Sequence, residues 1–249
     1  MHSAVLEYLH KLSPESKARL TEHFLDEVEE IALLIGKAME TLQTYYAAQR
    51  DQNPGANPKY VAFGVMTKGA NTLAAALELS LAGYLWEPSI LLRSALEGCA
   101  AAWDMVHNPS RFAAWQTGKF KSTDSISRAS EVAPEIGRLW GHLSNMNVHT
   151  SSINSSPSLV TIEDDFKFQF CGFVRAGNES VRATEVYLVM FVTYICLQLT
   201  ELVFHQYARE LETVEKIPGA DLMRTRVSDR HRRFVNAMKA HFAQLVRAP

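Results

Sequence analysis

Residues 85–104 read LWEPSILLRSALEGCAAAWD, and this stretch decides the fold. The Glu-Pro pair at 87–88 is typical of a helix start, because proline is tolerated in the first helical turn. The residues that follow are strongly apolar, but three charged side chains interrupt them: Arg93, Glu97 and Asp104. At about 100° per residue, these three lie within roughly 40° of one another on a helix. A helix this apolar is expected to be mostly buried, so its charges need partners.

The rest of the chain shows the same helical character. Apolar residues recur at helical spacing in several segments, and Ser-Pro or Asn-Pro pairs mark three of their starts. Further helices are predicted over residues 13–50, 58–84, 109–115, 134–150, 178–213 and 222–246, and residues 1–12 are predicted to form a short amphipathic helix or an arm. Residues 119–130 are rich in Ser and Lys, which favours a loop or a frayed helix. The sequence therefore predicts an all-α fold, a bundle of about six to seven helices.

One passage is typical of strands. Residues 159–162 read LVTI, an acidic turn follows, and residues 166–170 alternate as FKFQF. This pattern predicts a small β-hairpin near 158–171. Because an isolated hairpin is only marginally stable, we expect it to lie against the helices.

The composition indicates a soluble globular protein. Apolar residues make up 47% of the 249 residues and charged residues 21%, as in ordinary globular domains. The formal net charge of −2 gives no overall field that would favour nucleic acid or an anionic membrane. The N-terminus lacks a signal-peptide pattern, and the longest apolar run, residues 186–197, is too short to span a bilayer. We therefore expect one helical domain over residues 1–249, located in the cytoplasm and without membrane contact.

The cysteines give no sign of a metal or disulfide site. Cys99, Cys171 and Cys196 are widely spaced, and Cys99 and Cys196 lie in apolar helical segments. This context predicts small core residues in a reducing compartment. The chain also lacks a glycine-rich phosphate loop, a Cys-x-x-Cys pair and a His-Glu-x-x-His motif. We expect no cofactor and no metal.

A second polar group lies in the segment WGHLSNMNVHT, residues 140–150. His142, Asn145 and His149 share one face of the predicted helix, at positions i, i+3 and i+7. The two histidines are about 10 Å apart along the axis, too far to bind one metal ion together. One interpretation makes His149 a structural residue at a helix end. The other makes it a general base or ligand-orienting group beside Asn145, facing the row that begins at Arg93.

The charged row itself has several interpretations. An exposed stripe would contain an i, i+4 ion pair of Arg93 with Glu97, worth about 0.3–0.5 kcal/mol. The alternative is a buried or cleft-lining row, favoured because residues 90–106 contain only four polar side chains. A buried pair of this kind is most often structural, and a functional cleft is the remaining possibility.

These two segments carry a family resemblance. LRSALE at 92–97, followed about fifty residues later by Leu143-Ser144 and then His149, resembles an uncharacterised bacterial helical family. Its hallmark segments are Arg-Ser-x-x-Glu and Leu-Ser-x-x-x-x-His. Residues 80–150 are also distantly similar to HEPN ribonucleases, which are helical, often dimeric, and use Arg-polar-x-x-x-His on RNA. In that pattern Asn145 matches the polar position, whereas Ser144 stands where the arginine is expected.

The resemblance implies a HEPN-like core over about 58–214 and, for any enzyme, a metal-independent endoribonuclease. Its implied catalytic residues are His149, Arg93 and Asn145. The residues expected to surround a ligand are Glu97, Asp104, Ser144 and His142. A homodimer and an RNA partner follow from the same resemblance, in a role in stress or phage defence with degenerate or absent nuclease activity.

Two other functions stay open. The first is a non-enzymatic interaction or scaffold protein, in which the polar row is structural. The second is a bundle that binds a small ligand in a pocket lined by Trp103, Trp140 and the row. The basic helix predicted over about 222–246 is a solvated face or a contact for phosphate, and it could neighbour the acidic first half of the 13–50 helix.

Overall fold

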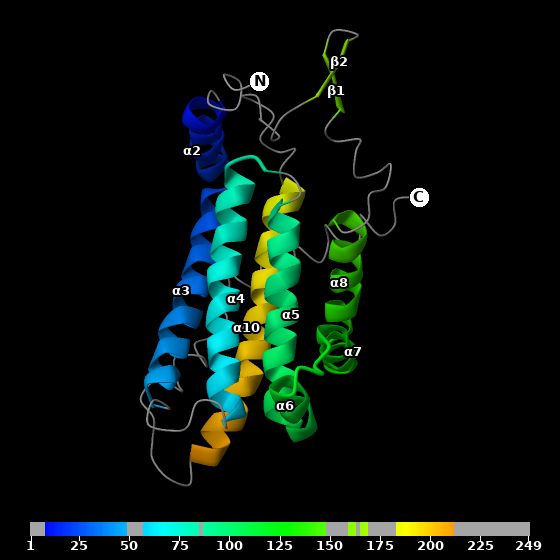
Figure 1. Cartoon of the computed structure of the whole chain (residues 1–249). Coiled ribbons are helices and arrows are strands. Elements are labelled where there is room, and N and C mark those ends of the chain that lie inside the picture. Colours follow the sequence, from blue (N-terminus) through cyan, green and yellow to red (C-terminus); the bar gives the residue numbers. More distant parts are fainter. Residues whose placement is uncertain are drawn as a thin grey trace.

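A computed structural model describes residues 8–48, 57–84, 87–147, 159–162, 165–168 and 183–211 (Figure 1). The first described element is a short π-helical turn, η1 (Tyr8–Leu12). The α-helices are α2 (Ser13–His23), α3 (Leu25–Ala48), α4 (Pro58–Leu81), α5 (Glu87–His107), α6 (Pro109–Gln116), α7 (Ser122–Val132), α8 (Pro134–Asn147) and α10 (Ala183–Leu211). The predicted all-α class is confirmed for the described part of the chain. No helix in these ranges is long and apolar enough to cross a lipid bilayer.

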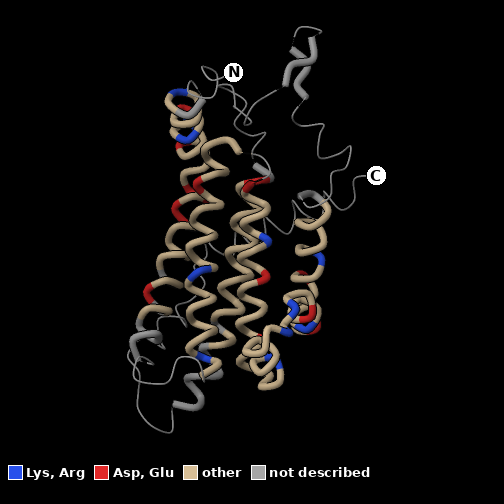
Figure 2. The backbone as a smooth tube through the Cα atoms, in the orientation of Figure 1, with Lys and Arg blue, Asp and Glu red and all other residues tan. Residues whose placement is uncertain are grey.

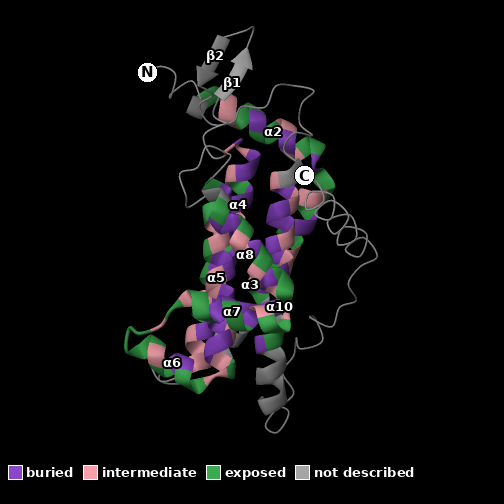
Figure 3. Cartoon of the chain, turned by 90° about the vertical axis from the view of Figure 1, so that its right-hand side faces the viewer, coloured by how far each residue is buried: buried purple, intermediate pink, exposed green. Residues whose placement is uncertain are grey.

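Four long helices, α3, α4, α5 and α10, lie side by side and form the bundle (Figure 1). Their facing sides bury a continuous apolar core, seen as the purple positions in Figure 3. Its largest fully buried side chains include Ile31, Phe63, Met66, Leu96 and Met190. Many of the contacts of α4 and α5 are made by alanine and glycine, which lets these two helices pack closely.

Three shorter helices, α6, α7 and α8, form an arm over residues 109–147. Helices α7 and α8 pack against α5 and against each other, on the side of α5 away from α3 (Figure 1). Helix α5 therefore lies between the other three bundle helices and the arm, which explains why so much of it is buried. Figure 2 shows acidic positions spaced along α3 and charges of both signs on α7.

One helix start has the predicted side-chain cap, whereas Asn108 before α6 makes no such bond and the N-cap of α2 is Leu12 instead of Ser13. Asn57 precedes α4, and its side-chain oxygen accepts the backbone N–H of Lys59 at 2.9 Å. This bond satisfies one of the four N–H groups that a helix start leaves without a partner.

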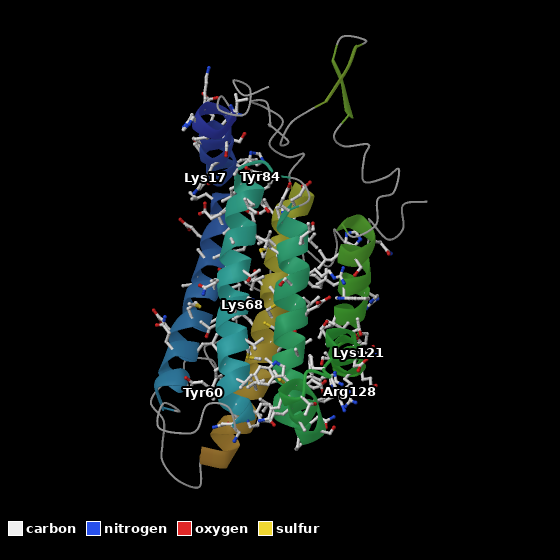
Figure 4. The ribbon with its side chains drawn as sticks, viewed as in Figure 1. Lys17, Tyr60, Lys68, Tyr84, Lys121 and Arg128 are labelled. Carbon is white, nitrogen blue, oxygen red and sulfur yellow. The ribbon has the colours of Figure 1, made fainter. Side chains whose placement is uncertain are left out.

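Near the other end of α4, Lys17 of α2 forms an ion pair with Glu78 (Figure 4 labels Lys17).

Two segments differ from their predictions. Residues 119–130 were predicted as a loop or a frayed helix, and residues Ser122–Val132 form the regular helix α7, because Ser125, Ile126 and Ala129 make a narrow buried face that needs few large apolar residues. The single helix predicted over 13–50 is divided into α2 and α3 at Phe24, whose φ of −109° and ψ of 31° depart from helical values. Phe24 is itself buried, so packing of its ring accompanies the break.

The strand-like passage forms β1 (Leu159–Ile162) and β2 (Asp165–Phe168), paired antiparallel with Leu159 opposite Phe168. These two short strands do not change the all-α class, which rests on the helices. The basic helix predicted over 222–246, together with His149 and Cys171, lies outside the described residues.

Candidate functional site

The carboxylate of Glu97 lies at the centre of a polar cluster where α5 meets the arm. Arg93, one helical turn earlier, donates its Nε–H to Glu97 Oε1 at 3.0 Å. Trp140 of α8 donates its indole N–H to the same oxygen at 2.7 Å, and Ser122 of α7 donates its hydroxyl to Oε2 at 3.3 Å. We call these four residues the Glu97 cluster. Three helices thus meet at one carboxylate whose two oxygens both accept hydrogen bonds.

Arg93 is held on a second side by an aromatic ring. Its guanidinium carbon lies 5.1 Å from the centroid of the Trp140 ring, within the range of a cation–π interaction. The side chains of Arg93 and Glu97 remain 24% and 23% exposed. Among the described residues, no acceptor is recorded for the two terminal nitrogens of Arg93. The guanidinium is therefore oriented by its Nε–H and by its ring-facing side, while its two terminal nitrogens can donate hydrogen bonds to a further partner.

Asp104 belongs to a separate and more deeply buried cluster. It is only 2% exposed, and its Oδ2 accepts hydrogen bonds from Arg111 Nε at 2.9 Å and from the Ser125 hydroxyl at 2.7 Å. A terminal nitrogen of Arg128 lies 3.9 Å from the other carboxylate oxygen, Oδ1. The carboxylate is thus fully surrounded by donors from α6 and α7.

Arg111 uses all its donor edges within this second cluster. Besides Asp104, it donates to Asp124 Oδ2 at 3.1 Å and to the Lys121 carbonyl at 2.8 Å. Its guanidinium also stacks on the Phe120 ring at 4.6 Å. The Asp104 cluster, as we define it, contains Asp104, Arg111, Asp124, Ser125 and Arg128. Figure 4 labels Lys121 and Arg128 on the arm. With every edge of its arginine occupied, this cluster has the form of a structural ion network.

The predicted row of three charges is therefore divided between two clusters. Helix α7 supplies Ser122 to the first and Ser125 to the second, one turn apart. Sequence reasoning missed these serines because it predicted a loop or a frayed helix there. It also missed Arg111, which follows Asp104 by seven residues across the turn between α5 and α6. The spacing of Ser122, Ser125 and Ala129 on one helix face was the signal that could have revealed the contact.

The polar face of α8 is placed differently from the prediction. His142 and Asn145 are exposed, whereas Leu143 and Ser144 are buried. The side chain that α8 presents to Glu97 is Trp140. Ser144 donates its hydroxyl to the Trp140 carbonyl at 2.7 Å. His142 and Asn145 thus do not join the Glu97 cluster, because the amphipathic pattern of α8 turns its large apolar residues toward α5. The prediction that His149 faces the row of Arg93 concerns a residue outside the described ranges.

His142 is the histidine of this segment that the structure describes. Partial desolvation by the surrounding protein lowers the pKa of His142, although the side chain is exposed. Within the ranges that the structure describes, no group of three or more His, Cys, Asp or Glu residues could hold a metal ion. The geometry around His142 is therefore that of a surface histidine.

The comparisons add no relative: the chain matches no protein-family model, no curated protein and no solved structure at a significant level. The function must be argued from the two clusters.

Proposed function

We propose that this chain is a HEPN-like, non-catalytic RNA-binding protein in which Arg93 contacts a phosphate group. The observation that carries the proposal is the orientation of the Arg93 side chain. Its Nε and its ring face are fixed by Glu97 and Trp140, while no described residue accepts from its terminal edge.

The chemistry of arginine suits this role. A guanidinium presents parallel N–H donors that match two oxygens of a phosphate. An arginine that is already oriented loses less conformational entropy on binding than a freely moving one. Because Trp140 and Ser122 also satisfy the Glu97 carboxylate, the terminal edge of Arg93 is not required to complete that carboxylate's hydrogen bonds. A bound phosphate would thus add contacts without removing any.

The α8 residues support binding over cleavage. In the HEPN pattern, Ser144 stands at the position of the arginine, and here its hydroxyl is committed to the Trp140 carbonyl. Asn145 is exposed on another side of α8 from Trp140. Neither of these two residues of the HEPN pattern therefore joins Arg93 in the Glu97 cluster, and we propose that nuclease activity is absent.

The test is RNA binding by the full chain, measured by fluorescence anisotropy with a labelled single-stranded RNA over a range of salt concentrations. We expect Arg93→Ala to weaken binding and to reduce the slope of log K against log salt by about 0.7, the value for one phosphate contact to a single strand. Arg138→Ala is the matched control, because Arg138 is an arginine of the arm that is 76% exposed and paired at 3.8 Å with Glu135. Equal affinity and slope for Arg93→Ala and wild type would reject the proposal.

A cleavage assay tests the non-catalytic part separately. The same RNA is incubated with wild type and with His149→Ala, and we expect neither protein to cleave it. Cleavage by wild type that the His149→Ala change abolishes would establish a ribonuclease instead.

A second candidate, an interaction scaffold that dimerises through the arm, is favoured by the Asp104 cluster. This network fixes α6 and α7 against α5, so the outer surface of the arm is presented as a rigid unit. Val132 on that surface is 59% exposed. Light scattering at micromolar concentration should show a dimer that Val132→Glu dissociates. A monomeric wild type would reject this candidate.

A further inference from the structure

A small cavity lies inside the bundle, between α3, α4, α5 and α10. Its volume is about 10 Å³, close to the smallest space that can hold one water molecule. Most of the lining is aliphatic, and among the described residues that border the cavity none is charged. Its lining residue on α5, Cys99, follows Glu97 by two residues and therefore lies on another face of that helix from the Glu97 cluster.

Two thiols border this cavity. Cys99 of α5 and Cys196 of α10 are free cysteines, each 2% exposed, and both belong to its lining. The neighbouring Cys99 thiol, and then burial, raise the pKa of the Cys196 thiol well above its ordinary value. The Cys196 side chain is therefore a neutral thiol at physiological pH.

A third sulfur-bearing residue, Met66 of α4, lines the same cavity and is 1% exposed. Two threonines also border it, but their hydroxyls are already bonded within α10. Thr193 donates to the Val189 carbonyl and Thr200 to the Cys196 carbonyl, each at 2.8 Å. Sulfur is thus the ligand type that three different helices bring to this space.

We propose that Cys99, Cys196 and Met66 form a binding site for one soft monovalent cation, of the class of Cu(I) and Ag(I). Thiolate and thioether sulfur select such ions over harder ones. The cavity has room for a bare ion but not for a hydrated one. This site is independent of the proposed RNA contact at Arg93.

The charge balance follows from the apolar lining. One cation enters and one thiol proton leaves to solvent, so the ion is held by one thiolate, one neutral thiol and the thioether. No electron is transferred, and the sulfur and metal oxidation states are unchanged. The occupied site is then neutral, which avoids the cost of burying an uncompensated charge. Because a proton is released, the affinity for the ion should rise with pH.

The test uses the full chain and Ag(I), which undergoes no redox change, in a chloride-free and thiol-free buffer. Equilibrium dialysis with metal analysis should give one ion per chain, and thermal unfolding should shift to higher temperature. Cys99→Ala and Cys196→Ala should each abolish the bound ion, and Met66→Leu should weaken binding by tenfold or more. Cys171→Ala is the matched thiol control and should bind as wild type does.

Three results would overturn the site: no ion bound by wild type, an ion retained by Cys99→Ala and Cys196→Ala, or an ion lost in Cys171→Ala. A second measurement needs no variant and so does not depend on the folding of core substitutions. X-ray absorption of the wild-type Cu(I) complex, prepared without oxygen, should show sulfur neighbours only. A nitrogen shell would place the ion on histidine and reject the proposal.

Discussion

Arg111→Ala should be among the most destabilising single changes in the arm. The substitution leaves the Asp104 carboxylate, which is 2% exposed, with the Ser125 hydroxyl as its one remaining close donor. Removing one partner of a buried ion pair typically costs about 3–5 kcal/mol. Arg128, whose side chain is 43% exposed and 3.9 Å away, compensates in part. We therefore expect a loss of about 3 kcal/mol in the free energy of unfolding, at the lower end of that range.

Urea unfolding followed by circular dichroism measures this loss. At an unchanged m-value, the midpoint should fall by about 1 M for a chain of this size. The control is Arg138→Ala, since that exposed arginine pairs only with Glu135 at 3.8 Å among the described residues, and its change should stay within about 0.5 kcal/mol.

A double-mutant cycle then isolates the pair itself. Combining Arg111→Ala with Asp104→Ala removes both charges, so the second substitution no longer leaves a buried carboxylate without its cation. The combined loss should be smaller than the sum of the two single losses, by about 2 kcal/mol. The reasoning is refuted if Arg111→Ala costs less than about 1 kcal/mol or if the two losses are additive.

Three further predictions concern α4, α5 and α8. Trp140→Phe removes the indole N–H that bonds Glu97 at 2.7 Å but keeps an aromatic ring, so urea unfolding should show a loss of about 1 kcal/mol; an unchanged value would mean that water replaces the bond at no cost. Gly69→Ala should be unfavourable in wild type, because a Cβ there would lie 3.2 Å from Cys99 Sγ. In a Cys99→Ala background the same change should stabilise α4 by about 0.5–1 kcal/mol, and equal effects in both backgrounds would contradict the contact. Desolvation lowers the pKa of His142 in the folded chain, so the unfolded chain binds the proton more readily and stability should fall as the pH drops through about 6.5. His142→Gln should lose less stability than wild type between about pH 7.5 and about pH 5.5, and parallel pH curves would show that His142 has no such role.

Local patterns were sufficient to predict α5. The Glu-Pro start at 87–88 and the apolar run placed this helix correctly, and the structure gives Glu87–His107. The same pattern indicated that the charges on α5 need partners, and the structure provides partners for all three. Proline at the first helical turn and helical spacing of apolar residues are properties of neighbouring residues, so they can be seen in one sequence.

The partners themselves could not be predicted in the same way. Trp140 is 43 residues from Glu97, and Ser122 is 25 residues away. Their approach depends on how α7 and α8 pack on α5, which no local spacing encodes. The sequence also left open whether α7 is a loop or a frayed helix, since its buried face is made of small and polar side chains. The orientation of α8 was assigned from its polar residues, although the buried Leu143 fixes which face turns inward.

The position of α5 between the other bundle helices and the arm has a consequence for the order of folding. The bonds of the Asp104 cluster close short loops, with separations of 7 and 21 residues for Arg111 and Ser125. By contrast, the cavity that Cys99 and Cys196 both line requires α10 to return across about a hundred residues. Short loops lose less entropy on closing, so a continuous segment from α4 to α7 can assemble before α10 arrives. These sequence separations predict that the other helices pack onto α5 and that closure by α10 is the slow step.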